Sequence, residues 1–113
     1  MRASLFVPEK LIDAGASVAG CGPAFVDLFI EALADGGVAC GLPRAKALEY
    51  AAQMTAGAAK LILESGKHPG RLKDEVCSPG GTTIQGVRAL EKGGLRSAVT
   101  EAVIAAYEKN FEL

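Results

Sequence analysis

Apolar residues recur along the chain at the spacing of a helix face. The clearest series follows an i, i+3, i+4, i+7, i+8 pattern and consists of Phe25, Leu28, Phe29, Ala32 and Leu33. Proline suits the first helical position, because its missing N–H has no partner there anyway. Glycine accepts the left-handed turn with which many helices end. The pattern therefore predicts a helix that begins at Gly22-Pro23 and ends at Gly36-Gly37.

Four further helices are expected downstream. They run from Pro43 to about Glu64, from about Gly70 to Val76 after Pro69, from Thr82-Thr83 to about Lys92, and from Leu95 to about Asn110. On the long second helix, the positions expected to face inward are Ala45, Leu48, Ala52, Ala56 or Ala59, and Leu63. Nothing after Pro8 alternates with period two for long enough to be a strand. We predict an all-α, five-helix domain with two long helices.

Apolar residues cover more than one face of the longest helices, and a domain of about 100 residues cannot bury all of that surface by itself. Alanine occurs 20 times and the aromatic residues number only six, which favours close helix packing. We therefore expect two copies intertwined as a homodimer. Residues 9–113 form the helical domain in this interpretation, and residues 1–8 are a linker remnant or an expression scar.

Composition excludes several classes of protein. The 113 residues carry a net charge of -1, which argues against a nucleic-acid partner. No apolar run approaches the ~20 residues of a membrane helix, so no membrane span is expected. The cysteines are odd in number and form no CxxC pair, so neither a disulfide framework nor a cysteine zinc site is indicated. A reducing, cytoplasmic location fits best.

The segment Ser78-Pro79-Gly80-Gly81-Thr82-Thr83 is the strongest candidate for chemistry. Adjacent glycines let a loop turn its N–H groups inward, and the following helix offers unpaired N–H groups and the positive end of its dipole. A carboxylate suits such a cradle, with about 1.5–3 kcal/mol for each charge-assisted hydrogen bond. An ordinary loop in which Thr82 or Thr83 caps the helix is the alternative, and spacing alone favours it somewhat.

Three other features have plain interpretations. Ala19-Gly20-Cys21-Gly22-Pro23-Ala24 is better read as helix initiation than as a binding loop. His68, the single histidine, is interpreted as a surface or capping residue. Asp27, Glu31 and Asp35 form an acidic line that resembles a metal ladder, but a solvated or salt-bridged face is the usual explanation. No metal site is expected.

Taken in order, seven segments resemble the C-terminal domain of pyrroline-5-carboxylate reductase. They are Gly22-Pro23-Ala24-Phe25, Leu28 to Asp35, Gly41-Leu42-Pro43-Arg44, Gly57-Ala58-Ala59-Lys60, His68-Pro69, Leu72 to Val76, and Ser78 to Ile84. The resemblance runs from about Glu9 to Leu113. It implies an intertwined dimer that supplies the imino-acid pocket of an enzyme reducing 1-pyrroline-5-carboxylate to L-proline with NAD(P)H, an oxidoreductase acting on a C=N bond.

The resemblance also implies roles for individual residues. Ser78, Gly81 and Thr82 would bind the substrate carboxylate, and Val76 would pack on the ring. Thr83 would hydrogen-bond the ring nitrogen, where its hydroxyl can orient that nitrogen or relay a proton.

No GxGxxG follows a strand, so no residue is assigned to the cofactor. Without a dinucleotide domain, we expect this chain alone to hold no NAD(P)H and to be inactive. The alternative is a non-enzymatic helical dimer whose Pro-Gly-Gly loop is only structural.

Overall fold

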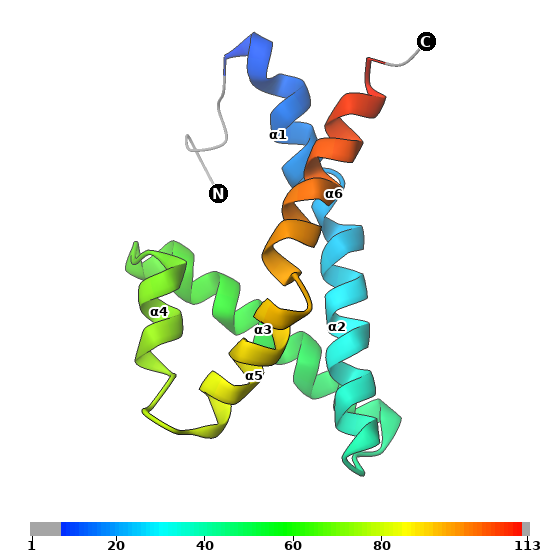
Figure 1. Cartoon of the computed structure of the whole chain (residues 1–113). Helices are drawn as coiled ribbons and strands as arrows, with labels where there is room; N and C mark the ends of the chain where they lie inside the picture. The colour runs from blue at the N-terminus through cyan, green and yellow to red at the C-terminus, as the bar shows by residue number, and fades with distance from the viewer. Residues whose placement is uncertain (1–7, 112–113) are drawn as a thin grey trace. The chain divides into compact units, whose positions relative to one another are not determined.

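A computed structural model describes residues 8–111, and over that range the chain is all-α (Figure 1). The fold class predicted from the sequence is confirmed. A short 3-10 helix at Glu9–Leu11 leads into the α-helices, which are α1 (Ile12–Ala19), α2 (Gly22–Ala39), α3 (Arg44–Ser65), α4 (Pro69–Glu75), α5 (Thr82–Lys92) and α6 (Leu95–Lys109). The five expected helices are present, and α1 is an additional one. Apart from Pro8, the linker or scar expected at residues 1–8 lies outside the described range.

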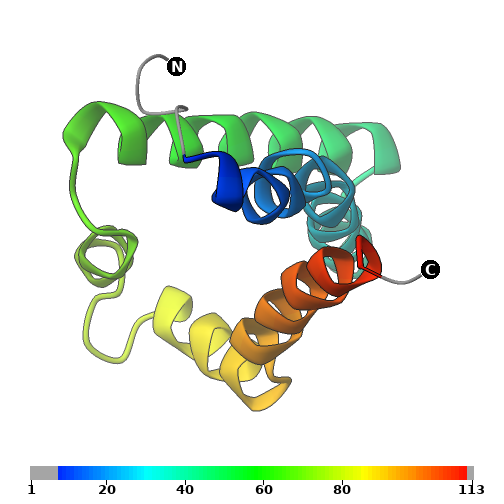
Figure 2. The same ribbon diagram turned by 90° about the horizontal axis from the view of Figure 1, so that it is seen from above.

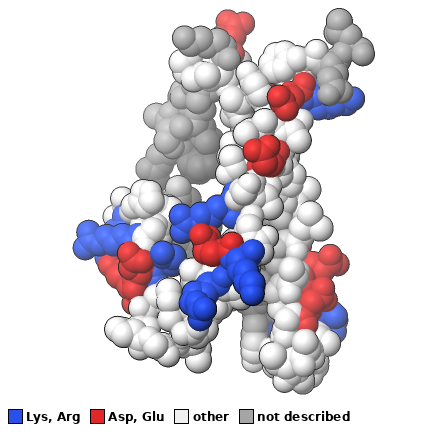
Figure 3. Space-filling view, in the orientation of Figure 1, with Lys and Arg blue, Asp and Glu red and all other residues white. Residues whose placement is uncertain are grey.

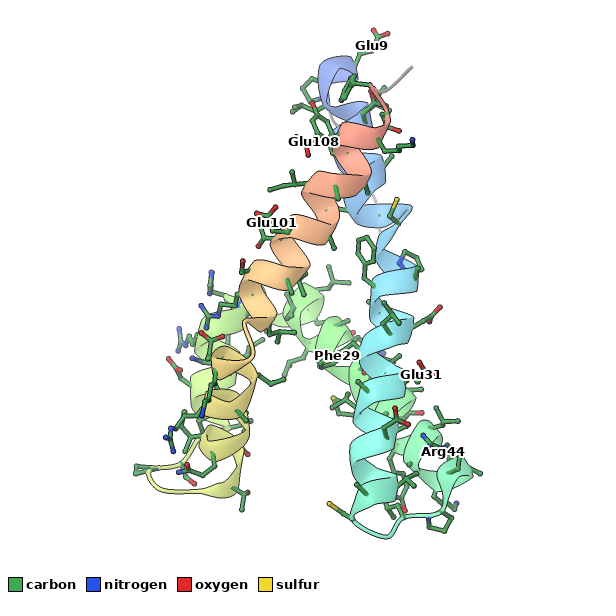
Figure 4. The ribbon with its side chains drawn as sticks, turned by 45° about the vertical axis from the view of Figure 1, so that its right-hand side comes forward. Glu9, Phe29, Glu31, Arg44, Glu101 and Glu108 are labelled. Atoms are coloured by element: carbon green, nitrogen blue, oxygen red, sulfur yellow. The ribbon has the colours of Figure 1, made fainter. Side chains whose placement is uncertain are left out.

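The chain divides into two compact units. One unit combines the residues up to Asp27 with those from Gly94 onward, and there α1 packs against α6 (Figure 1). Ser17 on α1 is buried, and its hydroxyl donates a hydrogen bond to the carbonyl of Asp13, 2.9 Å away. Glu101 and Glu108 lie seven residues apart and point to the same side of α6 (Figure 4), as helical geometry requires.

The second unit, Leu28 to Gly93, begins with a tight α2–α3 hairpin. The helix α2 continues to Ala39, so the predicted end at Gly36-Gly37 is wrong. The turn is made instead at Gly41, whose φ of 105° suits glycine. A Cβ on Gly37 would stand 3.2 Å from Leu42 Cδ1 and 3.3 Å from Ala47 Cβ. Gly37 therefore serves the close approach of α3 rather than the end of α2.

An ion pair joins the two helices of this hairpin. Arg44, the first residue of α3, donates from Nη1 to Oδ1 of Asp35 on α2 at 2.6 Å. Asp35 thus takes part in a salt bridge, the usual role expected for the acidic line. Phe29 and Glu31 lie on different sides of α2, and Arg44 lies at the start of α3 (Figure 4).

The rest of the second unit presents the candidate loop. The long α3 ends at Gly66, which has a φ of 68°, and α4 follows after Lys67 and His68. His68 caps α4, since its Nδ1 accepts a hydrogen bond from the N–H of Gly70 at 2.9 Å. This confirms the capping role. Residues 76–81 then join α4 to α5 (Figure 2).

Few side chains are buried within one copy of the chain. In the described range they are Ser17, Ala34, Ala47 and Ala51. On α3 the buried row is therefore Ala47 and Ala51, whereas the expected row through Leu48 and Leu63 is exposed. The large apolar side chains left exposed are Leu11, Ile12, Val18, Val26, Leu28, Phe29, Leu33, Leu42, Leu48, Tyr50, Met54, Leu61, Ile62, Leu63, Val76, Leu90, Val99, Ile104, Tyr107 and Phe111. Within residues 8–111, a single copy has no large hydrophobic core.

Part of this apolar surface forms a hollow of about 260 Å³ in the second unit. It is lined by Leu33 and Gly37 of α2, by Leu42, and by Ala47, Tyr50, Ala51 and Met54 of α3.

Residues Ile12–Ala39 are long and apolar enough to cross a membrane by length and composition alone, which corrects the expectation that no such run exists. A helix packed inside a protein assembly passes the same test.

Candidate functional site

The five predicted site residues lie within eight consecutive positions, all in the second unit. Val76 follows the last residue of α4, and its side chain is 65% exposed. Ser78 lies in the loop, Gly81 is the N-cap of α5, and Thr82 and Thr83 are the first two residues of that helix. The structure therefore brings all five together at the start of α5.

A tight turn brings Ser78 next to the start of α5. The N–H of Gly81 donates to the carbonyl of Ser78 at 3.1 Å, and Gly80 in the middle of the turn has a φ of 70°. That φ lies in the left-handed region, which glycine adopts without strain. A Cβ on Gly81 would collide with Oγ of Ser78. Glycine at position 81 thus lets the Ser78 hydroxyl lie directly against the helix start.

The N–H groups of the first helical turn are available to a ligand. The N-cap position of α5 is occupied by Gly81, and no side chain makes a capping hydrogen bond there. The alternative in which Thr82 or Thr83 caps α5 therefore does not hold. Across residues 8–111, no protein group accepts a hydrogen bond from the N–H of Thr82, Thr83 or Ile84. These groups carry the positive end of the helix dipole. The N–H of Gly81, in contrast, is already used inside the turn.

The surroundings of the loop carry mixed charge. Lys and Arg side chains lie among Asp and Glu side chains over α4 and α5 (Figure 3). Glu75, at the end of α4, pairs with both Lys67 and Arg71, an arrangement that the sequence analysis did not anticipate. Arg88 on α5 bonds to Gln85 at 2.7 Å.

The remaining sequence candidates lie elsewhere. A Cβ on Gly20 would stand 2.8 Å from the carbonyl oxygen of Ala16, so this glycine serves the junction of α1 and α2. Within this segment Ala19 and Gly20 end α1, and only Gly22 onward begins a helix, so the segment joins two helices. The three cysteines, Cys21, Cys40 and Cys77, are free. No group of three potential metal ligands gathers in the part of the chain that the structure describes.

The chain is similar to known proteins over nearly its whole length. A family model described as pyrroline-5-carboxylate reductase dimerisation matches residues 9–113. A pyrroline-5-carboxylate reductase from Synechocystis is 60% identical over 107 residues, which is 95% of this chain and 40% of the relative. The Escherichia coli reductase is 52% identical over 107 residues, with the same coverage. The chain thus spans about two fifths of the length of these relatives.

Solved structures agree in fold. The reductase from Streptococcus pyogenes matches with a TM-score of 0.88 and 42% identity, covering 92% of this chain and 40% of that one. The Plasmodium falciparum reductase, solved with NADP bound, matches with a TM-score of 0.86 and 41% identity, covering 91% of this chain and 42% of that one.

Proposed function

Because the chain belongs to the pyrroline-5-carboxylate reductase dimerisation family, we propose that it is the dimerisation and substrate-binding domain of a reductase that converts 1-pyrroline-5-carboxylate to L-proline. The hydride donor of that reaction is NAD(P)H. The described residues do not fit a dinucleotide, because residues 8–111 form no strand and therefore no βαβ unit to hold its pyrophosphate. The 113 residues alone are then expected to be inactive.

The observation that carries the proposal is the set of unpaired N–H groups at Thr82, Thr83 and Ile84 beside the hydroxyl of Ser78. A carboxylate accepts several hydrogen bonds at once, and the helix dipole favours its negative charge. In this proposal Ser78 and the N–H of Thr82 bind the substrate carboxylate. Gly81 contributes by lacking a side chain, which keeps the Ser78 hydroxyl close to the helix start.

In this proposal, Val76 and Thr83 contact the pyrroline ring of the substrate. The exposed side chain of Val76 offers an apolar surface on which the pyrroline ring packs. The hydroxyl of Thr83 hydrogen-bonds the ring nitrogen, which must carry a proton for the neighbouring carbon to accept hydride. Thr83 thus orients the nitrogen or relays its proton. Fixing both the carboxylate and the nitrogen leaves one face of the imine carbon open to the donor.

The proposed partner is a second copy of the chain. The exposed apolar side chains on α2, α3 and α6 require a cover in water, and the family is a dimerisation family. A reducing cytoplasm suits the three free thiols.

Titration of the isotopically labelled chain with L-proline, followed by NMR, tests the carboxylate site. We expect the amide signals of Thr82 and Thr83 to shift on binding. L-prolinamide, which lacks the carboxylate, is the matched ligand and should leave them unmoved. Ser78→Ala should weaken binding about tenfold, because it removes one hydrogen bond to a charged group. Ser97→Ala, an exposed serine on α6, is the control variant.

If saturating L-proline moves neither signal, the loop is only a structural turn and the proposed pocket is wrong. Turnover of substrate with NADPH by these 113 residues, at a rate comparable to a complete reductase, would contradict the expected inactivity.

A further inference from the structure

An ion-pair cluster around Glu75 connects the two ends of α4. Lys67 Nζ lies 3.2 Å from Oε2 and 3.5 Å from Oε1 of Glu75, and Arg71 Nε lies 3.4 Å from the same Oε2. Lys67 precedes α4, whereas Glu75 is its last residue. One carboxylate therefore ties the segment that enters the helix to the point where the chain leaves it. We call Lys67, Arg71 and Glu75 the Glu75 cluster.

The helix α4 has few other means of support. It has seven residues, a length at which a helix is not stable by itself in water. None of its residues is fully buried, and Leu72 is only half-buried, so packing within one copy holds it weakly. The His68 cap secures only its first turn. The Glu75 cluster is thus the principal side-chain link between its two ends.

The Lys67–Glu75 pair is also more shielded than the Lys60–Glu64 pair of α3. The side chains of Lys67 and Glu75 are 39% and 44% exposed, against 73% and 66% for Lys60 and Glu64 on α3. Water and salt screen a partly shielded pair less than a fully exposed one. Lys60 and Glu64, 3.8 Å apart, therefore serve as a natural comparison.

The chain that leaves Glu75 is the candidate site itself. Val76 donates from its N–H to the carbonyl of Lys73 at 3.1 Å, and Cys77 donates to that of Asp74 at 3.2 Å. The turn closed by Gly81 and Ser78 follows directly. The direction in which the chain leaves α4 thus sets where the Ser78 hydroxyl meets the start of α5.

We propose that Glu75 is a positioning residue for substrate binding: through Lys67 and Arg71 it holds α4 formed, and α4 in turn holds the Ser78 turn against α5. This inference rests on the proposed carboxylate site. Glu75 touches no substrate in this proposal and acts only through the backbone that follows it.

Amide hydrogen exchange and L-proline affinity, measured on the full chain, test this role. Glu75→Gln keeps the shape of the side chain and removes its charge. We expect exchange at Cys77 and Gly81 to rise about fivefold and L-proline affinity to fall about fivefold, the size of a partly shielded ion pair. The melting temperature should stay unchanged. Glu64→Gln, the matched control, should alter none of these quantities.

Two further variants test whether Glu75 acts through its ion pair with Lys67. Lys67→Met should reproduce part of the effect, and Lys67→Met combined with Glu75→Gln should be no worse than Glu75→Gln alone, since the pair is already broken. Unchanged exchange at Cys77 and Gly81 in Glu75→Gln, or equal changes in Glu64→Gln, would overturn the role of Glu75. So would faster exchange with unaltered L-proline affinity. Hydrogen exchange is measured without ligand. If the unaltered chain does not bind L-proline, that result therefore contradicts the proposed function, while the exchange data still test whether Glu75 holds α4 formed.

Discussion

Gly37 on α2 faces Ala47 on α3 so closely that a Cβ on the glycine would stand 3.3 Å from the Cβ of the alanine. Such a distance is tighter than ordinary van der Waals contact, so no side chain larger than hydrogen fits without movement. Ala47 is 3% exposed, and it is one of the two buried residues of α3. The close packing of α2 against α3 thus depends on glycine at position 37.

Replacing Gly37 with leucine should destabilise the protein. The added atoms would meet Leu42 and Ala47, and overpacking of this kind costs about 1–3 kcal/mol. Urea denaturation followed by circular dichroism measures the change. Gly36→Ala is the matched control, because a Cβ there meets nothing within 4 Å. It should raise stability by about 0.5–1 kcal/mol, the helix preference of alanine over glycine. Equal effects at both positions would argue against the close contact.

A methyl group at position 81 should disrupt the candidate site. Gly81→Ala places its Cβ against Oγ of Ser78, so the hydroxyl must move away from the helix start. We expect L-proline affinity to fall by at least about tenfold, or 1.4 kcal/mol. Isothermal titration calorimetry measures the loss. Gly86→Ala, on α5 with open space around it, should bind as the unaltered chain does. Retained affinity in Gly81→Ala would show that the Ser78 hydroxyl is not used.

A separate prediction concerns the hydrogen bond with which His68 caps α4. His68→Ala removes the acceptor for the Gly70 N–H, and loss of an N-cap costs about 0.5–2 kcal/mol. Because α4 has no buried residue, the loss should appear as faster hydrogen exchange at Gly70 rather than as global unfolding. His68→Asn supplies another acceptor and should restore most of the protection. If alanine and asparagine behave alike, the side-chain hydrogen bond contributes nothing.

Dilution should lower the stability of the protein. When folding is coupled to association in a two-state dimer, each tenfold dilution removes about 1.4 kcal/mol of apparent stability. Thermal unfolding at several protein concentrations measures this dependence, and sedimentation equilibrium gives the mass. A melting temperature that is constant over two decades of concentration would mean that one copy folds alone, contrary to what its exposed apolar side chains indicate.

Local sequence rules located most helix ends and the loop, but tertiary packing decided the rest. The start of α2, both ends of α5 and the end of α3 at Gly66 were predictable, because proline, glycine and helical spacing act locally. The short helix α1 was not predicted, since its small residues give a weak pattern and it packs against a helix from the other end of the chain. Gly36-Gly37 resembled a helix end only because the contact of Gly37 with Ala47 is invisible in the sequence.

In the candidate site, too, some features follow from the local sequence and others depend on the fold. Ser78, Gly81, Thr82 and Thr83 are neighbours in the chain, so their proximity followed from the sequence. That Gly81, rather than a threonine, is the N-cap depends on the fold of the turn. The pairing of Lys67 with Glu75 spans eight residues and depends on the left-handed Gly66, so charge spacing alone did not reveal it.

The absence of any buried residue in α4 affects how damaging variants can be detected. Only Leu72 among its large apolar side chains is half-buried, so this helix can open while exposing little new apolar surface, and its opening is largely uncoupled from the cooperative unfolding of the whole protein. A thermal-shift screen records only that cooperative event. Such a screen would classify substitutions at Lys67 or Glu75 as neutral, even where they weaken ligand binding. Variants in this segment must therefore be sorted by binding assays, not by heat resistance.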